Sequence, residues 1–285
     1  MILGYCKIIF TTFQYSNNLI SQYQITMTQL IHKIAVVTGG AGGIGSAICK
    51  KLAAEGATIV ITYNSNEEKA KQLKEELRGD NHSISHAPVN DSAALTKLAE
   101  LIKDKYGKLD ILVNNAGITT PVAHDDLDGL TDEWIDKIFT TNVRGTFAMI
   151  RAMKGLLMKG NEIVNLKSSI INSSLVVNIS SVAAISGIGS NVAYCASKAA
   201  IDSMTRSLAR ALAPAIRVVS VSPGWVKGEY AKNFNPEYIS QQLKATPLNR
   251  FATPEDVADA VFALATTLKF TTGSIIPVDG GRLLK

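Results

Sequence analysis

A tyrosine and a lysine four residues apart, Tyr194 and Lys198, are the side chains of this sequence best suited to acid–base chemistry. Two residues at this spacing on a helix project from one face, so both side chains can reach the same small volume. A phenol alone has a pKa of about 10, but a neighbouring ammonium favours the phenolate and lowers that pKa toward neutrality. The hydroxyl of Ser181, arriving at the end of a separate strand, could hold a carbonyl oxygen against the phenol. The alternative is an amphipathic helix that exposes one Tyr and one Lys without using them.

Residues 38–45, TGGAGGIG, form a glycine-rich run between a short apolar stretch and a helical pattern. Glycines let the backbone turn sharply and approach a pyrophosphate, and the N-terminus of the following helix offers it free N–H groups. In a strand–loop–helix context this predicts a dinucleotide site, with a flexible glycine turn as the alternative. The run fits GxGxxG through Gly40, Gly42 and Gly45, and TGxxxGxG through Thr38, Gly39, Gly43 and Gly45.

The end of the second apolar stretch bears on the choice between the two nicotinamide dinucleotides. NAD binding favours a carboxylate about 20 residues further along, hydrogen-bonded to the ribose 2′-hydroxyl. Here the stretch ends in Tyr63, Asn64 and Ser65, and the first acid, Glu67, already belongs to the next helix. Nothing in this segment would repel a 2′-phosphate, and Asn64 and Ser65 could donate to it. NADP(H) is therefore favoured. NAD(H) remains possible, because this segment has no arginine that could pair with a 2′-phosphate.

Short apolar runs without polar alternation alternate with helical patterns along the chain. Such runs are typical of strands covered on both faces, and their alternation with helices predicts an α/β fold with a parallel sheet between two helical layers. The strands are expected at 33–38, 58–62, 83–87, 110–113, 175–180, 217–222 and 274–278. The helices are expected after the glycine run and at 67–78, 91–106, 132–157, 191–212, 236–244 and 254–267.

The beginning of the chain does not match this pattern. Residues 1–26 contain no run near the ~20 apolar residues that span a bilayer, and no clear signal peptide. We expect residues 1–30 to be a disordered or extraneous N-terminal tail and residues 31–285 to form one folded domain.

A local duplication affects the fifth strand, because IVNLKSS (163–169) resembles VVNISS (176–181) at an offset of thirteen residues. Only the second copy leads directly into the tyrosine helix, so the second copy is predicted to be the strand. The segment at about 159–174 is then an insertion, expected to be a surface loop or an extra hairpin.

Composition narrows the functional classes. Hydrophobic residues make up 46% and charged residues 19% of the 285, as in a soluble globular protein. The net charge of +5 is scattered, so no nucleic-acid patch is expected. The three cysteines, Cys6, Cys49 and Cys195, have neither paired nor metal-ligand spacing, which predicts reduced thiols, no metal site and a cytoplasmic location.

Taken together, several motifs make residues 33–281 resemble the short-chain dehydrogenase/reductase family, in particular its 3-oxoacyl-acyl-carrier-protein reductase-like members. Ser181 precedes Tyr194 by thirteen residues, the usual interval of the family, whereas Ser168 of the duplicated segment does not. The motifs are TGGAGGIG, NNAG (114–117), Asn142 within TTNVRGTF, Ser181, YCASK (194–198), PGWV (223–226) and the closing PVDGG (277–281).

The resemblance implies a single Rossmann-type three-layer αβα domain with a seven-stranded parallel sheet, assembled as a homotetramer or homodimer. It also implies roles for four residues. Tyr194 would be the general acid–base, Lys198 would lower the tyrosine pKa and bind the nicotinamide ribose, and Ser181 would position the substrate oxygen. Asn142 would hold a water that links Lys198 to solvent.

The resemblance further implies cofactor contacts on the adenosine side and around the carboxamide. Pro88, with Val89 beside it, stands where the family often has an Asp near the adenine, and Gly228 stands where a Thr commonly follows the PG motif. With the residues named above, the predicted cofactor-binding set is Thr38, Gly39, Gly43, Ile44, Gly45, Tyr63, Asn64, Ser65, Val89, Asn114, Ala116, Gly117, Tyr194, Lys198, Pro223, Gly224 and Val226.

The substrate pocket is expected at three segments, 118–129, 183–188 and 227–234, since ligands of α/β sheets bind beyond the carboxyl ends of the strands. His124 and the acids at 125, 126 and 128 are expected to form a solvated turn, or else to disfavour anionic substrates at that rim. The predicted reaction is hydride transfer between NADP(H) and a ketone or secondary alcohol, with a small carbonyl compound or a 3-oxoacyl group on an acyl carrier or CoA as substrate. The alternatives are a sugar, polyol or secondary-alcohol dehydrogenase and a catalytically silent NADP-binding regulatory protein.

Overall fold

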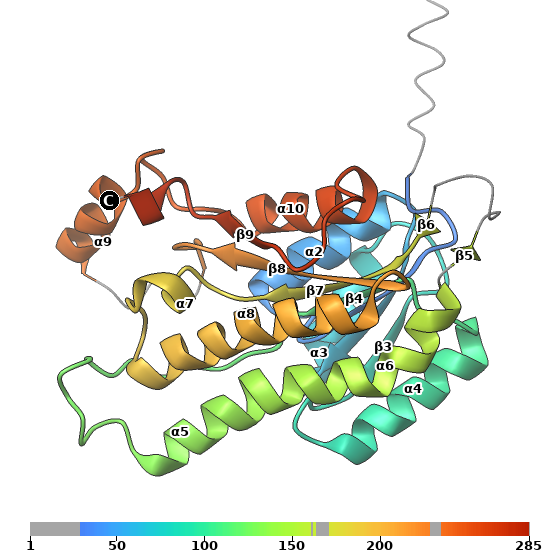
Figure 1. Cartoon of the computed structure of the whole chain (residues 1–285), viewed down its shortest axis with the longest axis horizontal. Helices are drawn as coiled ribbons and strands as arrows, with labels where there is room; N and C mark the ends of the chain where they lie inside the picture. The colour runs from blue at the N-terminus through green and yellow to red at the C-terminus, as the bar shows by residue number, and fades with distance from the viewer. Residues whose placement is uncertain (1–28, 161, 164–170, 229–234, 285) are drawn as a thin grey trace, which may run out of the picture.

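The computed structural model of the chain describes residues 29–160, 162–163, 171–228 and 235–284. The fold is a parallel sheet between two layers of helices (Figure 1). Seven strands lie in the order β3-β2-β1-β4-β7-β8-β9, and each neighbouring pair is parallel. Their bounds are β1 (Ile34–Val37), β2 (Thr58–Tyr63), β3 (Ser83–His86), β4 (Ile111–Asn114), β7 (Ser174–Ile179), β8 (Ile216–Pro223) and β9 (Ile275–Val278). The predicted Rossmann-type architecture is confirmed.

The two faces of the sheet are covered by different helices (Figure 1). One face packs against α2 (Gly43–Ala54), α3 (Glu67–Glu76) and α10 (Pro254–Thr266). The other face packs against α4 (Ser92–Tyr106), α6 (Thr146–Gly160) and α8 (Val192–Leu212). Because alternate side chains of a strand point to opposite faces, Val37 belongs to the first core and Val36 to the second, and both are fully buried. The apolar runs read from the sequence are therefore strands covered on both sides.

Shorter elements surround the carboxyl ends of the strands. They are α5 (Asp132–Ile138), the π-helical segment η1 (Phe139–Gly145), α7 (Ala183–Ser186), α9 (Pro236–Lys244) and a 3₁₀ turn, η3 (Arg282–Leu284). All strands of a parallel sheet end on the same side, so the segments that follow them lie together there. A ligand site is expected at this end of an α/β sheet. In the described part of the chain, no helix has the length and apolar character that a membrane crossing requires.

The single helix predicted at 132–157 differs from the structure in two respects. The helical region is longer, ending at Gly160, and it is interrupted by η1, whose wider turns accommodate one extra residue per hydrogen-bonded loop. Gly145 ends this segment directly against Val89, since a Cβ at Gly145 would lie 2.7 Å from Val89 Cγ2. Hydrophobic periodicity did not reveal the interruption, because η1 continues the same helical rod.

Two predicted boundaries also shift. Leu30 is buried and donates its N–H to Glu55 O at 2.9 Å, so the folded domain includes residue 30, which was assigned to the tail. The prediction for residues 1–26 lies outside the described residues. The insertion is narrower than 159–174, since α6 reaches Gly160 and β7 begins at Ser174. Within it, β5 (Glu162–Ile163) pairs antiparallel with β6 (Ile171–Asn172), as in the predicted hairpin.

Candidate active site

An open cleft of about 830 Å³ lies at the carboxyl ends of the central strands. It joins residues that are far apart in the sequence, from the glycine-rich run to the segment after β8. The predicted site residues that line it are Gly43, Ile44, Gly117, Ser181, Tyr194, Lys198, Pro223, Gly224 and Val226. The nucleotide side and the acid–base pair predicted from the sequence thus open into one cleft.

Lys198 is a buried ammonium beneath the phenol ring of Tyr194. Its Nζ lies 5.6 Å from the Tyr194 ring centroid and donates to Ile179 O at 2.8 Å. Burial lowers the pKa of Lys198 to about 8, and the Asp202 carboxylate one helical turn further along partly offsets this. A cation so placed acts electrostatically on the adjoining phenol with little screening by water.

The N-terminus of α8 is fastened to the loop that follows β4. Asn191 is fully buried and accepts the Tyr194 N–H at 2.6 Å, as a helix N-cap does. Its amide also donates to Thr120 O at 2.7 Å. This cap fixes where the Tyr194 side chain enters the cleft.

Ser181 reaches the cleft from the end of β7. Flanking backbone bonds to the end of β8, from Ser180 N to Val221 O and from Val182 N to Pro223 O, set the path of the chain there. The Ser181 hydroxyl accepts the Ala183 N–H at 3.2 Å, at the start of α7. Ser181 and Tyr194 therefore face the same cleft from separate elements, as the sequence predicted. Ser168 lies outside the described residues.

Asn142 lies in the π-helical segment η1 and is fully buried. Its Oδ1 accepts the Ile118 N–H at 2.8 Å, and its Nδ2 donates to Ile118 O at 3.0 Å and to Ser197 Oγ at 3.1 Å. Both amide hydrogens thus serve protein groups that tie the post-β4 loop to α8. A Cβ at Gly117 would lie 3.3 Å from Asn142 Oδ1 and 3.7 Å from Lys198 Nζ, so the glycine leaves room for both groups beside the backbone. The water-mediated proton relay at Asn142 stays a prediction.

The glycine-rich loop is held by the motif NNAG. Thr38 Oγ1 accepts the N–H groups of Asn115 and Ala116, each at 2.9 Å. The Asn115 amide donates in return to Thr38 O at 2.9 Å and to Gly39 O at 3.1 Å. Asn115 was not among the predicted site residues, although its place within NNAG was a signal for it. Gly39, with φ of +59°, occupies the left-handed region that favours glycine.

The N-terminus of α2 fits the phosphate groups of a dinucleotide. Its N-cap, Gly42, makes no side-chain capping bond, so the first-turn N–H groups keep their capacity to bind an anion. Gly43 and Ile44 face the cleft, and a Cβ at Gly43 would meet no atom within 4 Å. Backbone can therefore approach a ligand closely at this point.

Asn114 is not on the cleft surface. It is buried in the sheet, and its amide donates to Asn178 Oδ1 at 2.9 Å. Asn178 donates in turn to Thr205 Oγ1 at 2.8 Å, so these side chains link β4 and β7 to α8. The Asn114 side chain is therefore used inside the sheet, and a contact of residue 114 with the adenosine side stays a prediction.

The remaining predicted cofactor residues lie at the edge of the site or support it. Thr38, Gly39, Gly45 and Ala116 build the loop, and Val89 is buried against Gly145. Tyr63, Asn64 and Ser65 end or follow β2, outside the residues that line the 830 Å³ cleft. The Tyr63 ring lies 5.6 Å from the ring of His86.

One wall of the cleft was missed by the sequence analysis. Trp225 packs between Tyr238 of α9 and Phe251, with ring centroids 5.7 Å and 5.6 Å away. Arg282, at the start of η3, lines the same cleft. No local pattern signalled Tyr238 or Arg282, because only the tertiary structure brings α9 and η3 to the site.

The buried ammonium of Lys198 makes stability depend on pH. The unfolded chain holds this proton up to its ordinary pKa of 10.5, whereas the folded chain releases it near 8. Burial therefore weakens folding below about pH 8, and the penalty fades as the pH rises toward 10.5. Between about pH 7.5 and 9.5, the wild type should gain about 2 kcal/mol of unfolding free energy relative to Lys198→Met. Urea unfolding of both proteins at both pH values measures this, and a difference independent of pH would refute it.

The chain is similar to known proteins along most of its length. The family described as enoyl-(acyl carrier protein) reductase matches residues 39–282. The chain is 36% identical over 261 residues to a 3-oxoacyl-(acyl-carrier-protein) reductase from Rickettsia felis, covering 90% of this chain and 100% of that one.

Solved structures show the same relationship. A short-chain dehydrogenase/reductase from Burkholderia xenovorans superposes with a TM-score of 0.80 at 30% identity, covering 89% of this chain and 98% of that one. A protein from Brucella melitensis, titled a short-chain dehydrogenase/reductase and glucose/ribitol dehydrogenase, superposes with a TM-score of 0.79 at 28% identity over the same shares. The chain therefore belongs to the short-chain dehydrogenase/reductase family of nicotinamide-dependent oxidoreductases, which act on carbonyl and alcohol groups.

Proposed function

We propose that the protein reduces a ketone reversibly with NADPH, and that 3-oxoacyl thioesters on an acyl carrier or CoA are its first substrate class. The observation that carries this proposal is the buried Lys198 under Tyr194, in a cleft that the uncapped N-terminus of α2 also enters. The relative from Rickettsia felis, a 3-oxoacyl-(acyl-carrier-protein) reductase by name, supports the substrate class.

Each catalytic side chain has one task in this proposal. Gly43 and Ile44 at the N-terminus of α2 would hold the phosphates of a nicotinamide dinucleotide, which would supply the hydride for the carbonyl carbon. Tyr194 gives its hydroxyl proton to the carbonyl oxygen, and Ser181 donates a hydrogen bond to that same oxygen. The Lys198 ammonium stabilises the phenolate left behind and binds the nicotinamide ribose. Asn142 orients the post-β4 loop and holds the water through which the proton is replaced.

The preference for NADP(H) over NAD(H) is supported at the end of β2. A carboxylate that selects NAD must be free to accept the ribose 2′-hydroxyl. Glu67 instead pairs with Lys71 at 3.0 Å, and hydrogen bonding to Lys71 holds the pKa of Glu67 below its usual range. Asn64 and Ser65 are exposed and can donate to a 2′-phosphate.

We also propose that the protein works in the cytoplasm as a homotetramer or homodimer. Cys49 and Cys195 are free thiols, in keeping with a reducing compartment. Phe139 and Phe147 are large apolar side chains exposed on η1 and α6, a face that a second copy would cover. Sedimentation of the full chain as a monomer at micromolar concentration would contradict the oligomer.

A two-cofactor substrate panel on the full chain tests the reaction. We expect oxidation of NADPH with acetoacetyl-CoA, at least about tenfold slower turnover with NADH at low cofactor concentration, and weaker NADH binding by titration. Equal dissociation constants for the two cofactors would remove the NADP(H) preference. Reduction of NADP⁺ by glucose or ribitol alone would favour the polyol alternative, which the Brucella melitensis structure supports by its title. Reduction of crotonyl-CoA alone would favour enoyl reduction, and NADPH binding without any turnover would favour a silent regulatory protein.

A further inference from the structure

The charges that line the cleft are of one sign. Among the described residues that line it there is no Asp or Glu, whereas Lys198, Lys227 and Arg282 all contribute to its surface. Lys198 is buried and belongs to the acid–base pair, but Lys227 is exposed and Arg282 is half-buried at the rim. A cleft with this composition raises the local concentration of anions.

Arg282 is held in a defined position. Its Nη1 donates to Gln242 O at 3.1 Å, and its Nη2 donates to Gln242 Oε1. A guanidinium has five N–H donors, so three remain without a bond to any described residue. A fixed guanidinium with spare donors matches a carboxylate or phosphate, which it can bind through two parallel hydrogen bonds.

The acids near Arg282 do not neutralise it. The Asp279 carboxylate accepts the N–H groups of Gly281 at 2.9 Å and Leu283 at 3.0 Å, and no ion pair joins it to Arg282 among the described residues. Asp279 closes the turn before η3 and is absent from the cleft lining. Lys227 likewise has no ion-pair partner in the described ranges, while its backbone N–H is anchored to Ala252 O at 2.8 Å.

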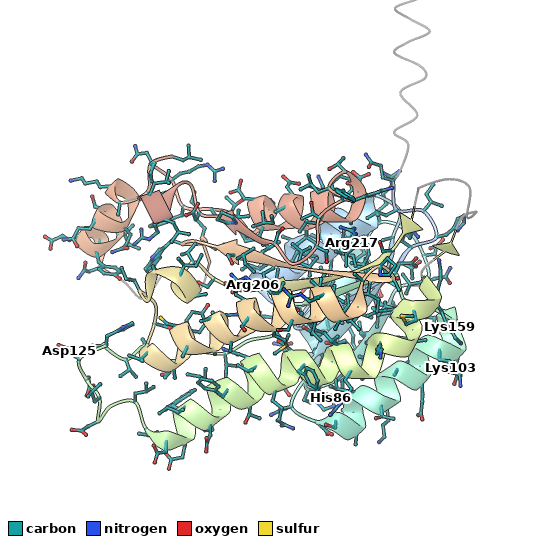
Figure 2. The ribbon with its side chains drawn as sticks, in the orientation of Figure 1. His86, Lys103, Asp125, Lys159, Arg206 and Arg217 are labelled. Atoms are coloured by element: carbon teal, nitrogen blue, oxygen red, sulfur yellow. The ribbon has the colours of Figure 1, made fainter. Side chains whose placement is uncertain are left out.

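The acidic loop after β4 does not oppose an anion either. Asp125, Asp126 and Asp128 are exposed, and none of them lines the cleft, although His124 beside them does. Asp126 accepts the Gly129 N–H at 2.9 Å within its own turn. Figure 2 shows Asp125 at the outer end of this loop. The exposure of these acids supports the solvated turn, and none of them contributes a carboxylate to the cleft surface.

The phosphates of the cofactor have a different place in the cleft. They are matched by the N-terminus of α2 at Gly43 and Ile44, whereas Arg282 is fixed to α9, the helix that carries Tyr238 against Trp225. Arg282 and the aromatic pair thus belong to one wall, built after β8 and after β9. This wall would face the part of the substrate beyond the reacting carbonyl.

We propose that the substrate carries an oxyanion, a carboxylate or a phosphate, which Arg282 binds with help from Lys227 while its ketone lies at Tyr194. The inference rests on the proposed function and adds a charge requirement to it. A carboxylate would belong to a small oxo acid, and a phosphate would belong to a CoA or pantetheine arm. The chemistry of recognition is the same for both sources, and substrates of each kind distinguish them.

The test compares three ketones on the full chain with saturating NADPH: acetoacetate, acetoacetyl-CoA and neutral ethyl acetoacetate. The variants are Arg282→Gln, Arg282→Lys and, as a matched control, Lys103→Gln. Lys103 is exposed on α4, and Figure 2 shows it at the opposite end of the molecule from Asp125, which follows the cleft residue His124. For Arg282→Gln, the ratio of kcat/KM for an anionic ketone to that for the neutral ester should fall about tenfold or more, mainly through KM.

The other arms complete the prediction. Arg282→Lys should recover part of the ratio because it keeps the charge but loses the fork geometry. Lys103→Gln should leave every ratio unchanged, and the thermal melting of each variant checks that it is folded. The ketone whose ratio falls identifies the source of the oxyanion.

Two results would overturn the inference. An equal loss on all three ketones together with a raised KM for NADPH would assign Arg282 to the cofactor. Unchanged ratios in a folded Arg282→Gln enzyme would remove the charge requirement while the proposed reductase function stands. If the wild type reduced none of the three ketones, the proposed function itself would fail, and this inference with it.

Discussion

Replacing Tyr194 with Phe should lower kcat by at least about a thousandfold, because the variant loses the only group proposed to protonate the carbonyl oxygen. The ring itself remains, so its contacts along α8 and above Lys198 Nζ are kept. The capping bond to Asn191 Oδ1 is donated by the backbone N–H of residue 194, so it is also kept. We therefore expect the dissociation constant for NADPH to change by no more than about twofold, since most of the predicted cofactor contacts lie elsewhere.

The matched control removes a hydroxyl of the same kind far from the cleft. Tyr106, at the end of α4, donates to Asn81 O at 2.6 Å, and Tyr106→Phe should lose some stability without losing turnover. Steady-state kinetics with acetoacetyl-CoA and fluorescence titration with NADPH measure both variants. Turnover of Tyr194→Phe at the wild-type rate would disprove the assignment of Tyr194 as the general acid.

Replacing Gly45 with Ala should disrupt the dinucleotide loop. A Cβ at this position would lie 2.5 Å from Gly39 O and 2.9 Å from the Gly40 Cα, both of them backbone atoms that cannot rotate away. It would also lie 2.8 Å from Asn115 Nδ2, which ties the loop to NNAG. We expect a loss of about 1–3 kcal/mol in unfolding free energy, as for other overpacked sites, and at least about tenfold weaker NADPH binding.

Gly43→Ala is the control for this prediction, because a Cβ there would meet no atom of the protein within 4 Å. At the first position of α2, alanine should keep or raise the stability by up to about 1 kcal/mol. Its methyl group would still face the cleft, so NADPH binding should weaken although the fold does not. Urea unfolding without cofactor and NADPH titration separate the two effects. Equal unfolding free energies for the two variants would show that the Gly45 contact is not tight.

Much of the fold was accessible from the sequence because the signals are local. The apolar runs of β1, β2 and β8 have no polar alternation, since parallel strands are covered on both faces. Tyr194 and Lys198 could be paired because four residues of helix bring side chains to one face whatever the surroundings. The glycine-rich loop could also be predicted from the sequence. Its backbone conformation, such as the positive φ at Gly39, restricts which residues can occupy it.

What the sequence left undecided depends on contacts between distant segments. The amide of Asn114 points into the sheet because Asn178 lies beside it on the paired strand β7. No sequence pattern around Asn114 predicts that partner. The extra residue in η1 is accommodated where Asn142 bonds Ile118 and Ser197, which are packed from two other elements.

The residues of the cleft show most clearly which features follow from the sequence and which follow from the tertiary structure. Sequence by itself determined the fold class, the glycine loop and the acid–base pair, because helix and strand geometry alone relates those residues. Only the tertiary structure decided how deeply Lys198 is buried, with its pKa lowered to about 8, and that Arg282 lines the same cleft. The burial of Lys198 and the contact between α9 and η3 depend on how the whole sheet packs with its crossover helices. That packing results from many weak contacts, which no short motif encodes.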